Sequence, residues 1–246
     1  TVSYPSGGCS ATQSTTITVI NCTGPVVTAT GSSVCPGNCA TVTSSASNGT
    51  APYTYLWSNS ATTQNISPCP AGTITYTVTV TDGGGVTSTG TAVVTVNPSI
   101  SLTAAATNIS CSGGTNGSAV ATPGSGTSPF TYNWSSGQST QTVTGLTSGS
   151  YTVTISDNKG CTATTSIAIV SPAPLTGQFV KGTANCAGCG CKEWVMTTAT
   201  GGTSPYTYTW PDGYVNRYKN KLCPGVQTIN VKDKNGCSIN VSVTAP

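Results

Sequence analysis

Cysteine is the residue type in this sequence that points most directly to chemistry. The chain of 246 residues contains 12 cysteines, no histidine and 5 acidic side chains. The run Cys186-Ala-Gly-Cys189-Gly-Cys191 holds a C-x-x-C knuckle, which is half of a zinc site and also a redox motif. The sequence offers no second knuckle, no histidine and no βαβ pattern around this run. We therefore favour disulfides over zinc or redox activity and expect no cofactor.

Charge and composition narrow the function further. With 8 Lys+Arg against 5 Asp+Glu, the chain has too little basic charge for nucleic-acid binding. Without histidine and with few carboxylates, no nucleophile–base pair can be assembled, so we predict that the protein is not an enzyme. No apolar run approaches the ~20 residues of a membrane span. Many cysteines in a Thr/Ser-rich chain indicate an oxidising, extracellular or cell-surface location.

Two motifs recur along the chain with one period. The first is a run from Gly-Thr to Trp, at 49–57, 126–134 and 202–210. The second is an aspartate that follows an alternating stretch: Asp82, Asp157 and Asp233. Both keep a spacing of about 76 residues, which is the signature of a tandem array. We predict the closing hairpin of a partial module followed by three full modules: 1–24, then 25–98, 99–174 and 175–246.

The two ends of the chain differ in how they cut the repeat. The N-terminus falls inside a module, whereas Val243-Thr-Ala-Pro246 resembles the linkers between modules. This pattern predicts a window onto a longer array. Alternatively, residues 1–22 act as a donor strand that completes a neighbouring subunit.

Within a module, apolar residues alternate with threonine. Tyr76, Val78 and Val80 show this period of two, which predicts a strand with one buried and one exposed face. Sequences such as Asp157-Asn-Lys-Gly160 predict turns between strands, since aspartate caps a turn and glycine supplies a positive φ. No stretch has helical periodicity. We predict an all-β protein whose modules are β-sandwiches of six or seven short strands.

The motifs together resemble a known family. The series Gly-Thr-x-Pro-[Tyr/Phe]-Thr-Tyr-x-Trp, Gly-x-Tyr-Thr-Val-x-x-x-Asp and Asn-x-Gly-Cys is similar to the SprB repeat of large surface adhesins of gliding Bacteroidetes. Module 2 resembles it most closely, whereas Gln227 replaces a tyrosine in module 3 and Val86 replaces the cysteine in module 1. The resemblance implies PKD-like, immunoglobulin-like modules in an extended surface stalk. It also implies export by the type IX secretion route and a role in attachment or gliding motility.

Two kinds of structural disulfide are expected within the modules. Cys111 and Cys161 are the only cysteines of module 2, so we expect them to pair, and Cys186 and Cys237 hold the same places in module 3. Such a bond would stabilise a module by about 2–4 kcal/mol. Alignment of modules 1 and 3 predicts a second kind of bridge, Cys39–Cys69 and Cys191–Cys223.

Four cysteines are left without an assigned partner: Cys9, Cys22, Cys35 and Cys189. Cys9 holds the same place as Cys161, so its partner is expected upstream. Cys22 and Cys35 are near enough to pair across the linker.

Aromatic and acidic residues repeat in every module, which favours structural roles. We expect Trp57, Trp134 and Trp210 to be core residues; the alternative is a sugar-stacking platform, because a tyrosine lies two residues before each tryptophan. One aspartate per turn is too few for calcium, so we expect the repeated aspartates to cap turns and predict no metal site.

Charge is concentrated in module 3. Residues 175–246 hold seven of the Lys/Arg residues and three of the acids. An insert at 212–221 combines aromatic and basic side chains: Tyr214, Arg217, Tyr218, Lys219 and Lys221. Such a loop could bind acidic polysaccharide by charge and stacking, or it could simply keep a nearly uncharged chain soluble.

The leading hypothesis is a structural stalk segment of a secreted bacterial surface adhesin or gliding filament, whose partners are the adjacent modules of the same chain. Two alternatives are a self-assembling extracellular filament subunit, which binds other copies of itself, and a carbohydrate-binding module that recognises surface polysaccharide.

Overall fold

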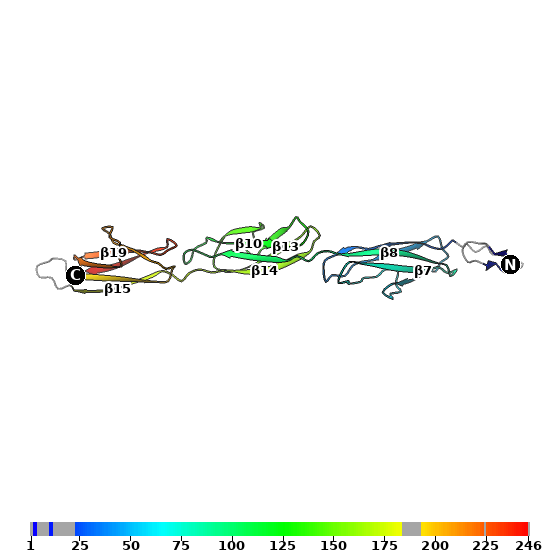
Figure 1. Ribbon diagram of the computed structural model, residues 1–246, viewed down its shortest axis with the longest axis horizontal. Coiled ribbons are helices and arrows are strands. Elements are labelled where there is room, and N and C mark those ends of the chain that lie inside the picture. Colours follow the sequence, from blue (N-terminus) through cyan, green and yellow to red (C-terminus); the bar gives the residue numbers. More distant parts are fainter. Residues whose placement is uncertain (1, 4–9, 12–22, 184–192, 224, 246) are drawn as a thin grey trace. The chain divides into compact units, whose positions relative to one another are not determined.

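The computed structural model describes residues 2–3, 10–11, 23–183, 193–223 and 225–245. Every regular element in these residues is a β-strand (Figure 1), as the alternating sequence pattern predicts. Over the same residues, no helix has the length and apolarity needed to cross a membrane.

The N-terminal segment contains one short antiparallel pair. Strand β1 (Val2–Ser3) pairs with β2 (Ser10–Ala11), with Val2 opposite Ala11. The rest of the predicted closing hairpin, including Cys9 and Cys22, lies outside the described residues.

Module 2 shows the fold of the repeat in its simplest form. It has two three-stranded sheets, with the orders β12-β10-β9 and β11-β13-β14. The strands are β9 (Leu102–Thr107), β10 (Gly117–Pro123), β11 (Thr131–Trp134), β12 (Thr142–Leu146), β13 (Gly149–Ser156) and β14 (Thr162–Ile169). In immunoglobulin lettering these sheets are A-B-E and C-F-G, so the module is an immunoglobulin-like β-sandwich.

Module 3 repeats this order with β15-β16-β18 and β17-β19-β20. Its strands are β15 (Thr176–Thr183), β16 (Glu193–Thr200), β17 (Thr207–Thr209), β18 (Tyr218–Leu222), β19 (Gly225–Lys232) and β20 (Ser238–Ala245). The predicted all-β, immunoglobulin-like fold class is confirmed.

Module 1 is a variant of the same sandwich. One sheet pairs β3 with β5, and the other has the order β4-β8-β7-β6. The strands are β3 (Val26–Thr30), β4 (Ser33–Val34), β5 (Thr43–Ser47), β6 (Thr54–Trp57), β7 (Ile74–Thr81) and β8 (Thr87–Val96). Strand β4 runs parallel to the end of β8, so the segment before β5 contributes one strand to each sheet.

The sheets and the compact units divide the chain differently. Among the described strands, each sheet draws its members from one predicted module. By its internal contacts, however, the chain forms two compact units. Unit 1 consists of Thr1–Ser101 with two turns of module 2, Ser125–Phe130 and Ser156–Cys161, and unit 2 contains the remainder. Two turns of module 2 therefore group with module 1 and not with the rest of their own sandwich.

Each sandwich is held by alternating apolar residues. In module 1, Val78 and Val80 of β7 are fully buried with Val94 of β8, while the intervening threonines face outward. In module 3, Ile229 and Val231 of β19 are buried beside Val243 of β20. Because side chains alternate between the two faces of a strand, every second residue is buried in the core and the threonines between them lie at the surface.

Candidate functional site: disulfide bridges between modules

A disulfide in unit 1 joins module 1 to a turn of module 2. Cys35 is bonded to Cys161, with their Cα atoms 5.4 Å apart and 126 residues of sequence between them. The bond therefore connects the beginning of one sandwich to the closing hairpin of the next.

The first cysteine of this bridge lies in a tight turn. The Asn38 amide donates to the Cys35 carbonyl at 3.1 Å, and Gly37 between them has φ 82°. Pro36 before a glycine of positive φ is the preferred sequence of a type II turn. Cys35 is thus the first residue of a turn that the local sequence specifies without help from the rest of the fold.

The second cysteine is held by an aspartate. Two hydrogen bonds join Asp157 to Cys161. The Asp157 amide donates to the Cys161 carbonyl, and the Cys161 amide donates to the side-chain oxygen Oδ1 of Asp157, each at 2.9 Å. The other carboxylate oxygen accepts the Thr127 amide at 3.0 Å. Gly160 closes the turn with φ 77°. One carboxylate therefore ties together the two turns of module 2 that belong to unit 1.

Hydrogen bonds to the carboxylates offset their burial. The Thr50 and Val86 amides hold the pKa of Asp82 below its usual value. Burial is the largest influence on Asp157 and acts to raise its pKa, but the amide donors together outweigh it, so the pKa is again lowered. Asp233 behaves in the same way. The three aspartates are turn caps, as the sequence predicts, and the lowered pKa values show that these hydrogen bonds favour the ionised carboxylate.

Unit 2 contains a second bridge of the same kind. Cys111 of module 2 is bonded to Cys237 of module 3, again across 126 residues, with a Cα separation of 5.6 Å. Cys111 also opens a turn with a glycine of positive φ, since the Gly114 amide donates to its carbonyl at 2.9 Å and Gly113 has φ 74°. Beside the bridge, Asn235 Nδ2 donates to the Ser110 carbonyl at 3.0 Å.

These bonds overturn two predicted pairings, Cys111–Cys161 and Cys186–Cys237. Cys161 immediately precedes β14, whereas the Ile109 amide, two residues before Cys111, donates to the Val170 carbonyl just beyond β14. An eight-residue strand spans roughly 26 Å, far more than the ~7 Å that a disulfide allows between Cα atoms. The two cysteines of one module therefore cannot pair with each other.

Of the second kind of predicted bridge, one bond lies within the described residues and the other lies partly outside them. Cys39 is bonded to Cys69 within module 1, as the alignment predicts. Cys223 is also disulfide-bonded. Its expected partner Cys191 lies outside the described residues. Cys186 and Cys189 also lie outside the described residues, and so does the zinc alternative for the run 186–191. Cys35, which was left without a firm partner, is the residue that bridges to module 2.

The three repeated tryptophans lie in the cores. Trp57 and Trp134 are each 2 % exposed and Trp210 is 1 % exposed, so their faces are not available to a ligand. Each indole Nε1 donates to the carbonyl six residues later, and the acceptors are Thr63, Thr140 and Asn216. This contact explains why the tryptophan recurs with the loop that follows it.

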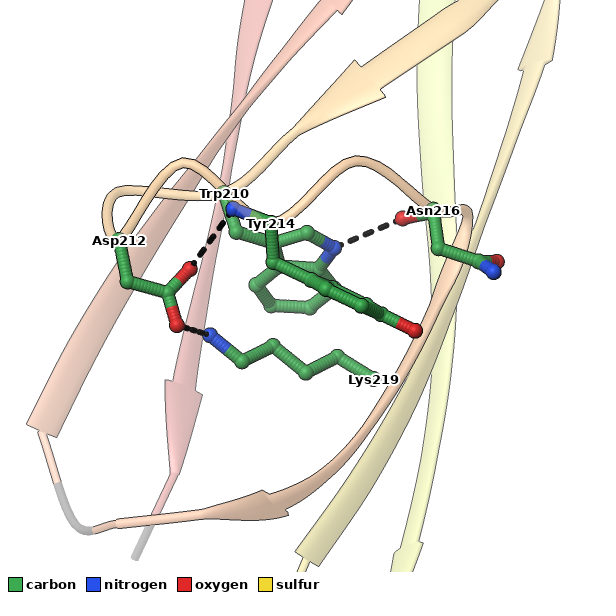
Figure 2. Close-up of polar contacts among 5 residues, drawn as sticks. All are labelled: Trp210, Asp212, Tyr214, Asn216 and Lys219. Atoms are coloured by element: carbon green, nitrogen blue, oxygen red, sulfur yellow. Dashed lines mark hydrogen bonds and ion pairs between the residues drawn. The ribbon is translucent and has the colours of Figure 1, made fainter.

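The predicted glycan loop of module 3 does not form one surface. Figure 2 shows Lys219 between Asp212 and the ring of Trp210. Lys219 Nζ is paired with Asp212 Oδ2 and lies 5.2 Å from the Trp210 ring centroid and 6.0 Å from that of Tyr214. The pKa of Asp212 is lowered, chiefly by the hydrogen bond from Lys219. Lys219 therefore supports the loop, whereas the side chain of Tyr214 is 47 % exposed.

Tyr218 belongs to a different group. The centroid of its ring lies 6.1 Å from that of Trp194, a residue that does not belong to the repeated motifs. The signal was present in the sequence, because Trp194 is the only tryptophan that does not recur in the other modules. Arg217 directly precedes β18, and Lys221 lies on β18 three residues after Tyr218.

Fold and bridges together define a class of protein. The described residues form a tandem array of immunoglobulin-like modules in which disulfides link module 1 to module 2 and module 2 to module 3, and such bonds indicate an oxidising compartment.

Comparison with known families identifies the repeat. Residues 32–62 and 103–139 match the family model of the SprB repeat, so the resemblance drawn from the motifs is confirmed in modules 1 and 2. No curated protein matches the sequence.

Similar solved structures include immunoglobulin and cadherin arrays. The eight N-terminal Ig domains of Down Syndrome Cell Adhesion Molecule align over 89 % of this chain at 13 % identity, with a TM-score of 0.44. This chain spans 36 % of that structure. Sidekick-1 immunoglobulin domains 1–5 align over 90 % of this chain and 58 % of that one, at 13 % identity and a TM-score of 0.33. Protocadherin Gamma B2 extracellular cadherin domains 3–6 align over 89 % of this chain and 71 % of that one, at 14 % identity and a TM-score of 0.26.

Proposed function

We propose that this chain is a stalk segment of a large secreted bacterial surface adhesin or gliding filament, with a structural rather than a catalytic role. The observation that carries the proposal is the pair of bridges between modules. With the main-chain linker, each bridge gives neighbouring modules two covalent connections. A second connection limits bending and twisting at the linker, which suits a part that holds something else away from a cell.

Other features support a position outside the cell. The SprB repeat occurs at two segments, and the resemblance carries with it the type IX secretion route and attachment to surfaces. Threonine-rich outer faces and few charges leave the surface little affected by the salt of the medium. The partners of such a segment are the adjacent modules of its own array.

The test is antibody labelling of the organism that makes the protein. Antibodies raised against the purified, oxidised chain should label intact cells, and their monovalent fragments should reduce attachment or gliding. The same antibodies should detect a band far above 24.5 kDa on a reducing, denaturing gel. Labelling only after permeabilisation would overturn the proposal. A band near 24.5 kDa, with filaments that dissociate in reductant, would instead favour a self-assembling subunit made of copies of this chain.

A further inference from the structure

The sheet β15-β16-β18 of module 3 has an outer face rich in apolar side chains. Trp194 and Met196 alternate along β16 with buried residues, so they point away from the core. Met196 pairs with Val180 of β15 on one side and with Tyr218 of β18 on the other. Val180 is 52 % exposed and Tyr218 is 42 % exposed. We call these four residues, with Gly182, the aromatic face.

Trp194 lies flat on this face. Gly182 is directly opposite Trp194 across the β15-β16 pair. A Cβ added at Gly182 would come within 2.8 Å of three atoms of the indole, so the ring rests on the backbone of the glycine. The ring of Tyr218 continues the surface with its centroid 6.1 Å away and its plane tilted by 32°. Two neighbouring rings of this kind form a platform on which another flat, partly apolar group can stack.

A cation borders the platform. Lys219 and Leu222 of β18 pair with Val195 and Glu193 of β16, and between these two pairs β18 bulges, which places Asn220 and Lys221 opposite Trp194. Arg217 points to the other face of the sheet, because it directly precedes Tyr218 and its carbonyl accepts the amide of the buried Thr197 at 2.8 Å. Within the described residues, the single ion pair is Lys219–Asp212, so the side chain of Lys221 remains available to an external anion.

The other modules lack this platform. Trp194 precedes the core tryptophan of its module by 16 residues, and the same place holds Thr41 in module 1 and Ser118 in module 2. A module of this fold therefore does not need an aromatic residue there. Trp194 is half-buried on this outer face and Tyr218 is 42 % exposed, so neither ring belongs to the core and both can contact a ligand.

We propose that the aromatic face binds an anionic polysaccharide. The apolar C–H face of a sugar ring stacks on Trp194 and Tyr218, and a carboxylate or sulfate of the glycan pairs with Lys221. Single-stranded nucleic acid also stacks on aromatic rings, but its affinity depends on many phosphate contacts, and one lysine supplies few. This site does not depend on the stalk role and adds to it a direct contact with a surface.

Calorimetric titration of the full, oxidised chain tests the proposal. The probes are alginate oligosaccharides, which carry a carboxylate on every sugar, and neutral laminari-oligosaccharides of equal length. The wild-type chain should bind alginate, and Trp194→Ser, which installs the residue that module 2 has at this place, should weaken binding at least tenfold. Lys221→Gln should remove most of the preference for alginate over the neutral glycan, whereas Arg217→Gln, on the other face of the sheet, should leave that preference unchanged. Lys234→Gln, which removes an exposed cation from a distant turn of the same module, should change nothing.

Fluorescence gives an independent readout. Three of the 4 tryptophans are buried, so quenching by acrylamide reports mainly on Trp194. Alginate should protect that signal. The proposal is overturned if no alginate binding is measured for the wild type, or if Trp194→Ser binds as tightly while its melting curve stays that of the wild type. It is also overturned if oligo-dT binds more tightly than alginate and Trp194→Ser abolishes that binding, because the face would then be a nucleic-acid site.

Discussion

The turn that closes module 1 (82–86) and the turn that closes module 2 (157–161) have the same hydrogen bonds but differ at three of their five residues, the last of which is Val86 in one and Cys161 in the other. In module 1, the Val86 amide donates to Asp82 Oδ1 at 2.8 Å and the Thr50 amide donates to Asp82 Oδ2 at 3.0 Å. Module 2 makes the matching contacts through Asp157, yet its last turn residue is the bridging Cys161. The aspartate therefore builds the turn whether or not a bridge is present. The cysteine adds a link to a site that is already in place.

Removing the bridge should have the largest effect. The double variant Cys35→Ser with Cys161→Ser should lower the free energy of unfolding of the linked modules by up to about 4–5 kcal/mol, because a loop of 126 residues is no longer closed in the unfolded state. Differential scanning calorimetry measures this loss. Val86→Ser is the matched control in the turn without a bridge and should cost about 1 kcal/mol or less. Equal losses for the two variants would contradict the bridge.

Removing the carboxylate should damage both turns alike. Asp82→Asn and Asp157→Asn each present an amide NH₂ to a backbone N–H that needs an acceptor, so both variants should melt at a lower temperature than the wild type. Asp212→Asn is the control, because its carboxylate is exposed and contacts Lys219. A large effect at Asp157 with none at Asp82 would show that the turn depends on the disulfide.

Acid should weaken the same turns. The pKa values of Asp82 and Asp157 are lowered in the folded protein from an ordinary 3.8, so the stabilisation is complete above about pH 4 and is lost as the pH falls through the folded-state values. Melting temperatures measured between pH 7 and pH 2 should therefore fall steeply below pH 4. The fall should be shallower in a variant with both aspartates replaced by asparagine. An unchanged slope would assign the acid sensitivity to other groups.

The glycines of the two turns should show the smallest effect. Gly85 has φ 82° and Gly160 has φ 77°, and an added Cβ would meet no atom within 4 Å at either position. Replacing either by alanine should cost about 1 kcal/mol, from backbone conformation alone. Gly72 has equally open space without a positive φ, so Gly72→Ala should be neutral or slightly stabilising. Urea denaturation distinguishes these outcomes.

Local features of this fold could be predicted from the sequence because each one depends on neighbouring residues. Period-two alternation identified strands such as β7, and the repeated aspartates identified the turns. The partner of Cys161 depends instead on which end of a sandwich each turn occupies. Each module has one cysteine near its start and one in its closing turn. Spacing alone therefore allows a bond within a module and a bond between neighbouring modules equally well. The direction of the first and last strands does choose, because it places Cys111 and Cys161 at opposite ends of β14.

The same limit applies to the candidate glycan site. Tyr214 and Tyr218 are close in sequence, and their composition suggested one loop surface. Successive residues of a strand point to opposite faces, so Lys219 turns toward Trp210 while Tyr218 turns toward Trp194. Trp194 was missed because attention to repeated residues hides a residue that occurs once.

The two bridges between modules close loops that overlap in sequence, and this overlap sets how far the chain can be stretched. A covalent path from Cys35 to Cys237 can cross to Cys161, return along the chain to Cys111 and cross again. That path contains about 50 residues of main chain in place of about 200, so its full length is roughly 170 Å where an unbridged chain would reach about 680 Å. Even with every strand unravelled, the segment would act as a short tether. Reduction of either bond would lengthen it abruptly.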